Sequence, residues 1–128
     1  MDLEFGFDQK KLSISLPGSQ LISVLQPNPV PVGVTGENEV KRSLLSPIGT
    51  ERLCKLVSPN HKVVIITSDI TRPFPSYKVI PSILDELRAA GVHYENITVV
   101  FALGSHRAHT RDEMCKLVGN EVFNQVRC

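Results

Sequence analysis

Residues 63–73 have the sequence VVIITSDITRP, which carries the strongest structural signal in the chain. Pro59 and Asn60 precede this stretch as turn residues. A short, continuous β-branched run bounded by turn signals is typical of a strand buried on both faces, and hence of a parallel sheet. We therefore predict a strand over residues 61–67, with the polar sequence SDITRP following it.

A second buried strand is predicted over residues 96–103, whose sequence NITVVFAL contains another β-branched and aromatic run. Between the two strands, apolar residues at helical spacing predict a helix that ends near Ala90. Gly91 is a suitable residue to end it, and Pro81 implies either a kink or a start at that point.

A further helix is predicted after the second strand, because Thr110 and Glu113 have the spacing of a capping box. The order strand–helix–strand–helix from residue 61 onward predicts a right-handed βαβ unit. The fold class is therefore α/β, with a parallel sheet formed by this unit.

The N-terminal part of the chain predicts a small β hairpin in front of the βαβ unit. Residues 3–7 and 12–16 are the expected strands, and Asp8, Gln9 and Lys10 supply the turn. Leu12, Ile14 and Leu16 alternate with serines, which is the period of a half-buried strand. Further segments are an extended piece at 21–25, a proline-rich connector at 26–33, a helix that Thr35 caps, and a short helix at 50–57.

Length and composition favour one globular domain over residues 1–128 and argue against several classes of partner. The 14 basic and 13 acidic residues give a net charge of +1, so no basic excess points to nucleic acid. No apolar run approaches membrane-spanning length, and the N-terminus lacks a signal-peptide pattern. Three cysteines without CxxC spacing are expected to be free thiols, so we expect a cytoplasmic location.

Polar residues follow both predicted strands, and they are the candidate site. Asp69 and Arg72 come after the first strand, and His106 comes after the second. Ligands of open α/β sheets bind beyond the carboxyl ends of the strands. Histidine can exchange a proton near neutral pH, and arginine can hold a carboxylate or phosphate through two bonds. The alternatives are that Asp69 only caps a turn and that His106 is a solvated loop histidine.

Two nearby residues are expected to be peripheral: Arg107 and His109. The remaining histidines, His61 and His93, precede the strands and are expected at the opposite end of the sheet.

Three stretches together resemble the N-terminal domain of the lactate racemase family: SDITRP at 68–73, GSHR at 104–107, and NEVKRSLLSPIGT at 38–50. The resemblance implies an isomerase that racemises or epimerises a small 2-hydroxy acid with a nickel-pincer nucleotide, by proton-coupled hydride transfer.

By the same resemblance, His106 matches a proton-handling histidine and Arg72 matches an arginine that holds the substrate. Asp69 matches a supporting acid, and Thr71 is the position that contributes a hydroxyl to cofactor or loop contacts. We expect both Asp69 and Thr71 to belong to the cofactor-binding part of the site.

The resemblance also implies residues that this chain does not contain. In the family, the lysine that binds the cofactor, the histidine that ligates nickel and the second catalytic histidine lie downstream of these loops. We therefore expect a fragment that holds no metal and is inactive by itself. A non-catalytic α/β module that binds a nucleotide or an anion is the alternative, and the oligomeric state is left open.

Overall fold

The computed structural model describes residues 1–7, 9–72 and 74–128 and confirms the α/β class. Asp8 of the expected turn and Pro73 of the first loop lie outside the described residues. The chain divides into two compact units, residues 1–31 and 32–128. Each unit is described by itself below.

The first unit is the predicted hairpin. Strands β1 (Asp2–Phe7) and β2 (Lys10–Ser15) pair antiparallel, from Asp2 opposite Ser15 to Phe7 opposite Lys10. The expected half-burial of β2 is wrong, because both Leu12 and Ile14 are exposed. The extended piece expected at 21–25 forms no strand, and a 3₁₀ turn (Gly18–Gln20) lies between β2 and this segment.

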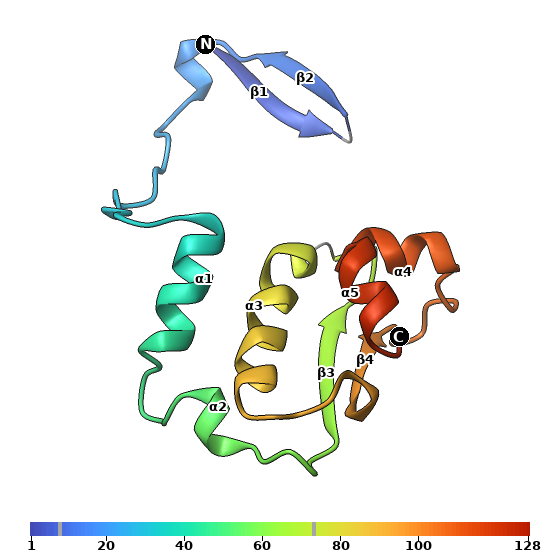
Figure 1. Ribbon diagram of the computed structural model, residues 1–128. Helices are drawn as coiled ribbons and strands as arrows, with labels where there is room; N and C mark the ends of the chain where they lie inside the picture. Colours follow the sequence, from blue (N-terminus) through green and yellow to red (C-terminus); the bar gives the residue numbers. More distant parts are fainter. Residues whose placement is uncertain (8, 73) are drawn as a thin grey trace. The chain divides into compact units, whose positions relative to one another are not determined.

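The second unit contains the βαβ arrangement (Figure 1). Its elements in chain order are α1 (Gly36–Leu45), α2 (Leu53–Leu56), β3 (Val63–Ser68), α3 (Ser76–Ala89), a 3₁₀ turn (Tyr94–Asn96), β4 (Ile97–Ala102), α4 (Arg111–Val118) and α5 (Asn120–Gln125). Strands β3 and β4 pair in parallel, as predicted, from Val63 opposite Ile97 to Ser68 opposite Ala102. Both strands therefore end at the same edge of the sheet.

The hydrophobic core lies on one face of β3–β4. Its fully buried side chains come from α3, the connection between α3 and β4, β4 itself and the C-terminal helices, and include Leu87, Val92, Ile97, Val99, Val118 and Val122. On the opposite face, Val64 and Ile66 of β3 are 59% and 72% exposed. The expectation of a strand buried on both faces is thus wrong, because within the described residues helices cover only one face.

The structure corrects three of the predicted helix features. Thr35 precedes α1, but its side chain accepts no capping hydrogen bond. Helix α2 is shorter than expected. Helix α3 begins at Ser76, so Pro81 lies inside it and is not its start.

Two predicted helix signals are confirmed. Gly91, with a φ of +84°, follows the end of α3 in a conformation that side chains disfavour. The capping box of α4 is present, with Thr110 and Glu113 bonding each other's backbone N–H groups. None of the described helices is both long enough and apolar enough to cross a membrane.

Candidate functional site

The loop after β3 is held at its base by two buried hydroxyl groups. Thr67 Oγ1 of β3 lies 2.5 Å from Ser76 Oγ, at the first residue of α3. Within the loop, Arg72 N–H donates to the carbonyl oxygen of Asp69 over 3.2 Å and closes a turn. These bonds place residues 69–72 at the carboxyl edge of the sheet, as the sequence predicts.

The loop after β4 turns sharply at a glycine. His106 N–H donates to the carbonyl oxygen of Leu103 over 3.0 Å, and Gly104 adopts a φ of +58° inside this turn. That conformation costs a glycine little and a residue with a Cβ more. The turn brings the side chain of His106 to the loop that follows β3.

Asp69 and His106 form the centre of the site. The Oδ2 atom of Asp69 makes a short hydrogen bond with Nδ1 of His106, and Thr71 Oγ1 donates to Oδ1 of Asp69 over 2.8 Å. Asp69 is only 3% exposed, whereas the side chain of His106 is 49% exposed. The acid therefore lies beneath the imidazole.

The hydrogen bond from His106 holds the pKa of Asp69 below its usual range, and the bond from Thr71 adds to this effect against the opposing effect of burial. Asp69 is therefore charged at neutral pH and accepts the Nδ1 proton of His106. Nε2 of His106 bonds to none of the described residues and keeps a lone pair that can accept a proton.

Arg72 faces the same small pocket as the acid–histidine pair. The pocket has a volume of about 170 Å³ and is lined by Asp69, Arg72 and residues 102–106. Arg72 is exposed, and its guanidinium pairs with no carboxylate among the described residues. The site thus combines an unpaired planar cation with a proton acceptor, which suits a small carboxylic acid.

Of the four candidate residues, Asp69, Arg72 and His106 line this pocket, whereas Thr71 is not among its lining residues. Thr71 contacts Asp69 within its own loop and lies 3.5 Å from Nδ1 of His106.

Arg107 lies away from this pocket. Its guanidinium forms two bonds with the carboxylate of Glu113, 2.7 and 2.8 Å long. His109, which the sequence also leaves at the periphery, contacts the first loop through Ile70. The feature of the sequence that could have pointed to His109 is its position, three residues after His106 and directly before the capping residue Thr110.

Comparison with known proteins decides the family. A family model described as the lactate racemase N-terminal domain matches residues 7–128. The chain belongs to the lactate racemase family. It is 36% identical over 123 residues to a lactate racemase of Thermoanaerobacterium thermosaccharolyticum, covering 94% of this chain and 29% of that protein. It is also 36% identical over 88 residues to a lactate racemase of Lactiplantibacillus plantarum, covering 69% of this chain and 20% of that protein.

A solved structure gives the same result for the fold. The lactate racemase apoprotein of T. thermosaccharolyticum matches with a TM-score of 0.80 and 34% sequence identity, over 99% of this chain and 29% of that chain. The predicted resemblance to the lactate racemase family is thus confirmed. The chain spans less than a third of the length of these relatives.

The described residues do not by themselves fit the nickel-pincer nucleotide that the family resemblance implies. They contain no cluster of three or more His, Cys, Asp or Glu side chains that could hold a metal ion. The pocket around His106 is also smaller than the roughly 300–1,000 Å³ of typical cofactor sites. What the fold brings together in this chain is a buried acid, an imidazole and a guanidinium around one small pocket.

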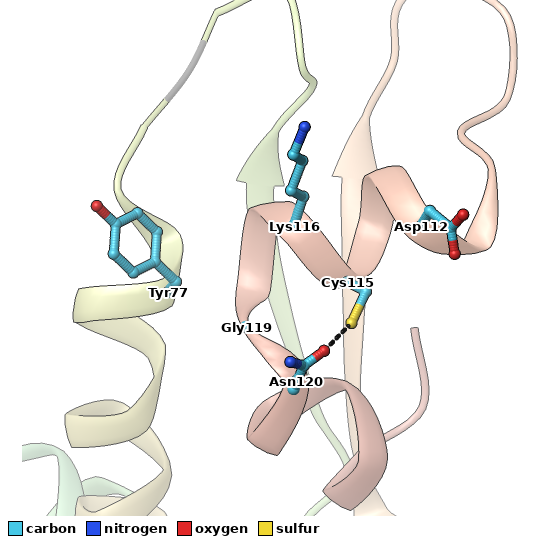
Figure 2. Close-up of a pocket in the computed structure, with 6 residues that line it drawn as sticks. All are labelled: Tyr77, Asp112, Cys115, Lys116, Gly119 and Asn120. Atoms are coloured by element: carbon cyan, nitrogen blue, oxygen red, sulfur yellow. Dashed lines mark hydrogen bonds between the residues drawn. The ribbon is translucent and has the colours of Figure 1, made fainter.

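A larger pocket of about 470 Å³ lies elsewhere, between the start of α3 and the α4–α5 junction. Figure 2 shows its six lining residues, with Cys115 Sγ donating to Oδ1 of Asn120 over 2.7 Å. This pocket contains none of the residues matched to the lactate racemase motifs.

Proposed function

We propose that this chain is the N-terminal portion of a racemase or epimerase that acts on small 2-hydroxy acids of the lactate type. The observation that carries the proposal is the shared pocket of His106 and Arg72, with Asp69 bonded to the imidazole from below. Membership of the lactate racemase family supports the reaction class.

Each side chain has a role that follows from its chemistry. Arg72 binds the substrate carboxylate, because its planar fork matches two carboxylate oxygens and no carboxylate of the described residues pairs with it. His106 accepts the proton of the substrate hydroxyl at Nε2. Asp69 stabilises the resulting imidazolium through Nδ1, and Thr71 keeps the carboxylate oriented.

Inversion at C2 also requires that the C2 hydrogen leave and return on the other face. The nickel-pincer nucleotide implied by the family would supply the hydride acceptor for that step when it is bound. His106 Nε2 takes the hydroxyl proton when its own hand of the acid is the substrate and gives a proton to the keto oxygen when that hand is the product. The second histidine that the resemblance implies would handle the proton of the opposite hand.

Isotopic labelling tests this proposal on the complete, cofactor-loaded enzyme. Lactate deuterated at C2 is racemised in ordinary water, and the product is analysed by chiral chromatography and mass spectrometry. Hydride transfer predicts that the product of opposite hand keeps its deuterium, whereas removal of the C2 hydrogen as a proton would exchange it with solvent. Loss of the label would contradict the proposed reaction.

A non-catalytic anion-binding role is the second candidate, and the unpaired guanidinium of Arg72 in a 170 Å³ pocket favours it. Both candidates predict that lactate binds near Arg72. Only the racemase predicts inversion of a 2-hydroxy acid, so a panel of such acids that all bind and none of which inverts would favour the binding role.

A further inference from the structure

His109 joins the two loops of the candidate site at a point that the proposed reaction does not use. The backbone N–H of Ile70 donates to Nε2 of His109 over 3.2 Å. Ile70 lies between Asp69, which bonds the imidazole of His106, and Thr71, which bonds Asp69. Nε2 of His109 is therefore hydrogen-bonded to the backbone segment that carries the buried Asp69.

The bond defines the protonation state of His109. Nε2 can accept this hydrogen bond only if it carries no proton, so the ring is neutral and its proton is on Nδ1. Nδ1 is buried and has no partner among the residues that the structure describes. A buried N–H without a partner is unfavourable, and a phenyl or thioether side chain at this position would avoid that cost. The hydrogen bond from the Ile70 N–H to Nε2 offsets the cost of leaving the Nδ1–H unpaired.

His109 is also held on a rigid support. Its ring packs edge-on against Phe101 of β4, with ring centroids 5.3 Å apart and an interplanar angle of 77°. The next residue, Thr110, begins the capping box of α4. The loop after β3 is more exposed, since both Thr71 and Arg72 lie at the surface.

We propose that His109 is a positioning residue, which accepts the Ile70 N–H and thereby holds Asp69 in hydrogen-bond contact with Nδ1 of His106. It acts on the reaction through Asp69 and touches no substrate. The role in turnover rests on the proposed function, whereas the positioning itself is a property of this chain and is testable without catalysis.

Two substitutions distinguish the effect of the hydrogen-bond acceptor of His109 from the effect of its aromatic ring. His109→Phe keeps an aromatic ring beside Phe101 but has no acceptor, and His109→Gln offers an amide oxygen near the place of Nε2. His61→Phe is the matched control, because His61 Nδ1 also accepts a backbone N–H, that of Ser58 over 3.3 Å, near the start of β3.

Nuclear magnetic resonance on the 128-residue chain measures the protonation of His109 Nε2, the exchange of the Ile70 amide and the pKa of Asp69. In the unchanged chain, His109 should show an unprotonated Nε2, and the Ile70 amide should exchange slowly with solvent. In His109→Phe, we expect Ile70 exchange to accelerate about 10-fold or more and the pKa of Asp69 to rise toward its ordinary value. His109→Gln should restore most of both signals, and His61→Phe should leave both unchanged.

Three results would overturn the inference. One is a protonated Nε2 on His109 in the unchanged chain, a measurement that needs no variant to fold. Another is an Ile70 exchange rate and an Asp69 titration that His109→Phe leaves as they were. The third is a failure of His109→Gln to restore what His109→Phe removes.

Turnover of the complete enzyme distinguishes this inference from the proposed function. His109→Phe should lower kcat by roughly 10-fold with little change in KM, since Arg72 is untouched, and His109→Gln should recover most of it. Normal turnover in His109→Phe would overturn the catalytic part of the inference while the racemase proposal stands. An enzyme that inverts no 2-hydroxy acid would refute the racemase proposal, and the resonance measurements would still test the positioning.

Discussion

Asp69 is a buried carboxylate that keeps its charge through hydrogen bonds rather than through water. Burial alone would raise the pKa of a carboxylic acid. The pKa of Asp69 is instead lowered, first by the bond from His106 and then by that from Thr71. A charged acid beneath a half-exposed imidazole fixes the tautomer of that imidazole, with the proton on Nδ1 and Nε2 left as the acceptor that the proposed reaction uses.

Arg72 provides the first prediction at this scale. Arg72→Lys should raise KM for the 2-hydroxy acid about 10-fold, because one charge-assisted hydrogen bond of roughly 1.5–3 kcal/mol is lost with the bidentate geometry. The kcat should fall less than KM rises. Steady-state kinetics with lactate measure both constants.

Arg42→Lys is the control for that change, because Arg42 pairs with Glu39 on the exposed side of α1 and lies outside the pocket. Unchanged kinetics in Arg72→Lys would remove Arg72 from the site.

At the scale of elements, Glu113 joins the loop after β4 to helix α4. Its carboxylate accepts bonds from Arg107 and from the backbone N–H of Thr110, and these bonds lower its pKa to about 2. A carboxyl group with a lowered pKa stabilises the fold above its ordinary value of 4.5, and this contribution is lost as the pH falls toward 2.

Glu113→Gln should therefore lower the free energy of unfolding at pH 6 and have little effect at pH 2. Urea denaturation of the 128-residue chain at several pH values measures this difference. Glu51→Gln, at an exposed position outside any helix, is the matched control. An equal loss at both pH values would mean that Glu113 acts through packing rather than through its charge.

Strand β3 shows which features of a sheet the sequence pattern predicts and which it does not. The β-branched run at 63–66 correctly predicted a strand and its parallel partner, because such runs are typical of parallel sheets. It wrongly predicted burial of both faces, since an apolar run does not reveal which of its side chains another layer covers. In the structure, burial alternates along β3, and Ile65 faces the same side as Val99 of the core.

A pair of substitutions tests this one-sided burial. Val99→Thr should destabilise the chain by roughly 1–3 kcal/mol, because it buries a hydroxyl group in the core. Ile66→Thr should change the free energy of unfolding by less than about 0.5 kcal/mol, as exposed substitutions usually do. Chemical denaturation measures both values, and a larger loss for Ile66→Thr would show that its face of the sheet is covered in solution.

At the scale of the whole molecule, motifs predicted the family and three of the pocket residues, because parallel strands bring their carboxyl ends to one edge. The hydrogen bond between Ile70 and His109 could not be predicted in this way. Its contact with Ile70 joins residues 39 positions apart and depends on the ring packing against Phe101. A division into units 1–31 and 32–128 was likewise not evident from composition, and one domain over residues 1–128 stays a prediction.

The metal content of the 128-residue chain provides a prediction at the same scale. We expect no stoichiometric nickel after incubation with Ni²⁺ and gel filtration, because the described residues form no cluster of three or more metal-binding side chains. Elemental analysis by mass spectrometry measures the ratio of metal to protein. One equivalent of retained nickel would show that donors in this chain form a site that we have not identified.

The central claim is that the imidazole of His106, supported by Asp69, takes and returns the hydroxyl proton of a small 2-hydroxy acid. The most direct test is the racemisation rate of the complete, cofactor-loaded enzyme carrying His106→Gln, compared with His93→Gln at an exposed histidine with no side-chain cap bond. We predict that His106→Gln lowers kcat by about 10²-fold or more, the usual scale for losing an acid–base group, while His93→Gln leaves it unchanged. A His106→Gln enzyme that racemises its substrate at the normal rate would contradict the claim.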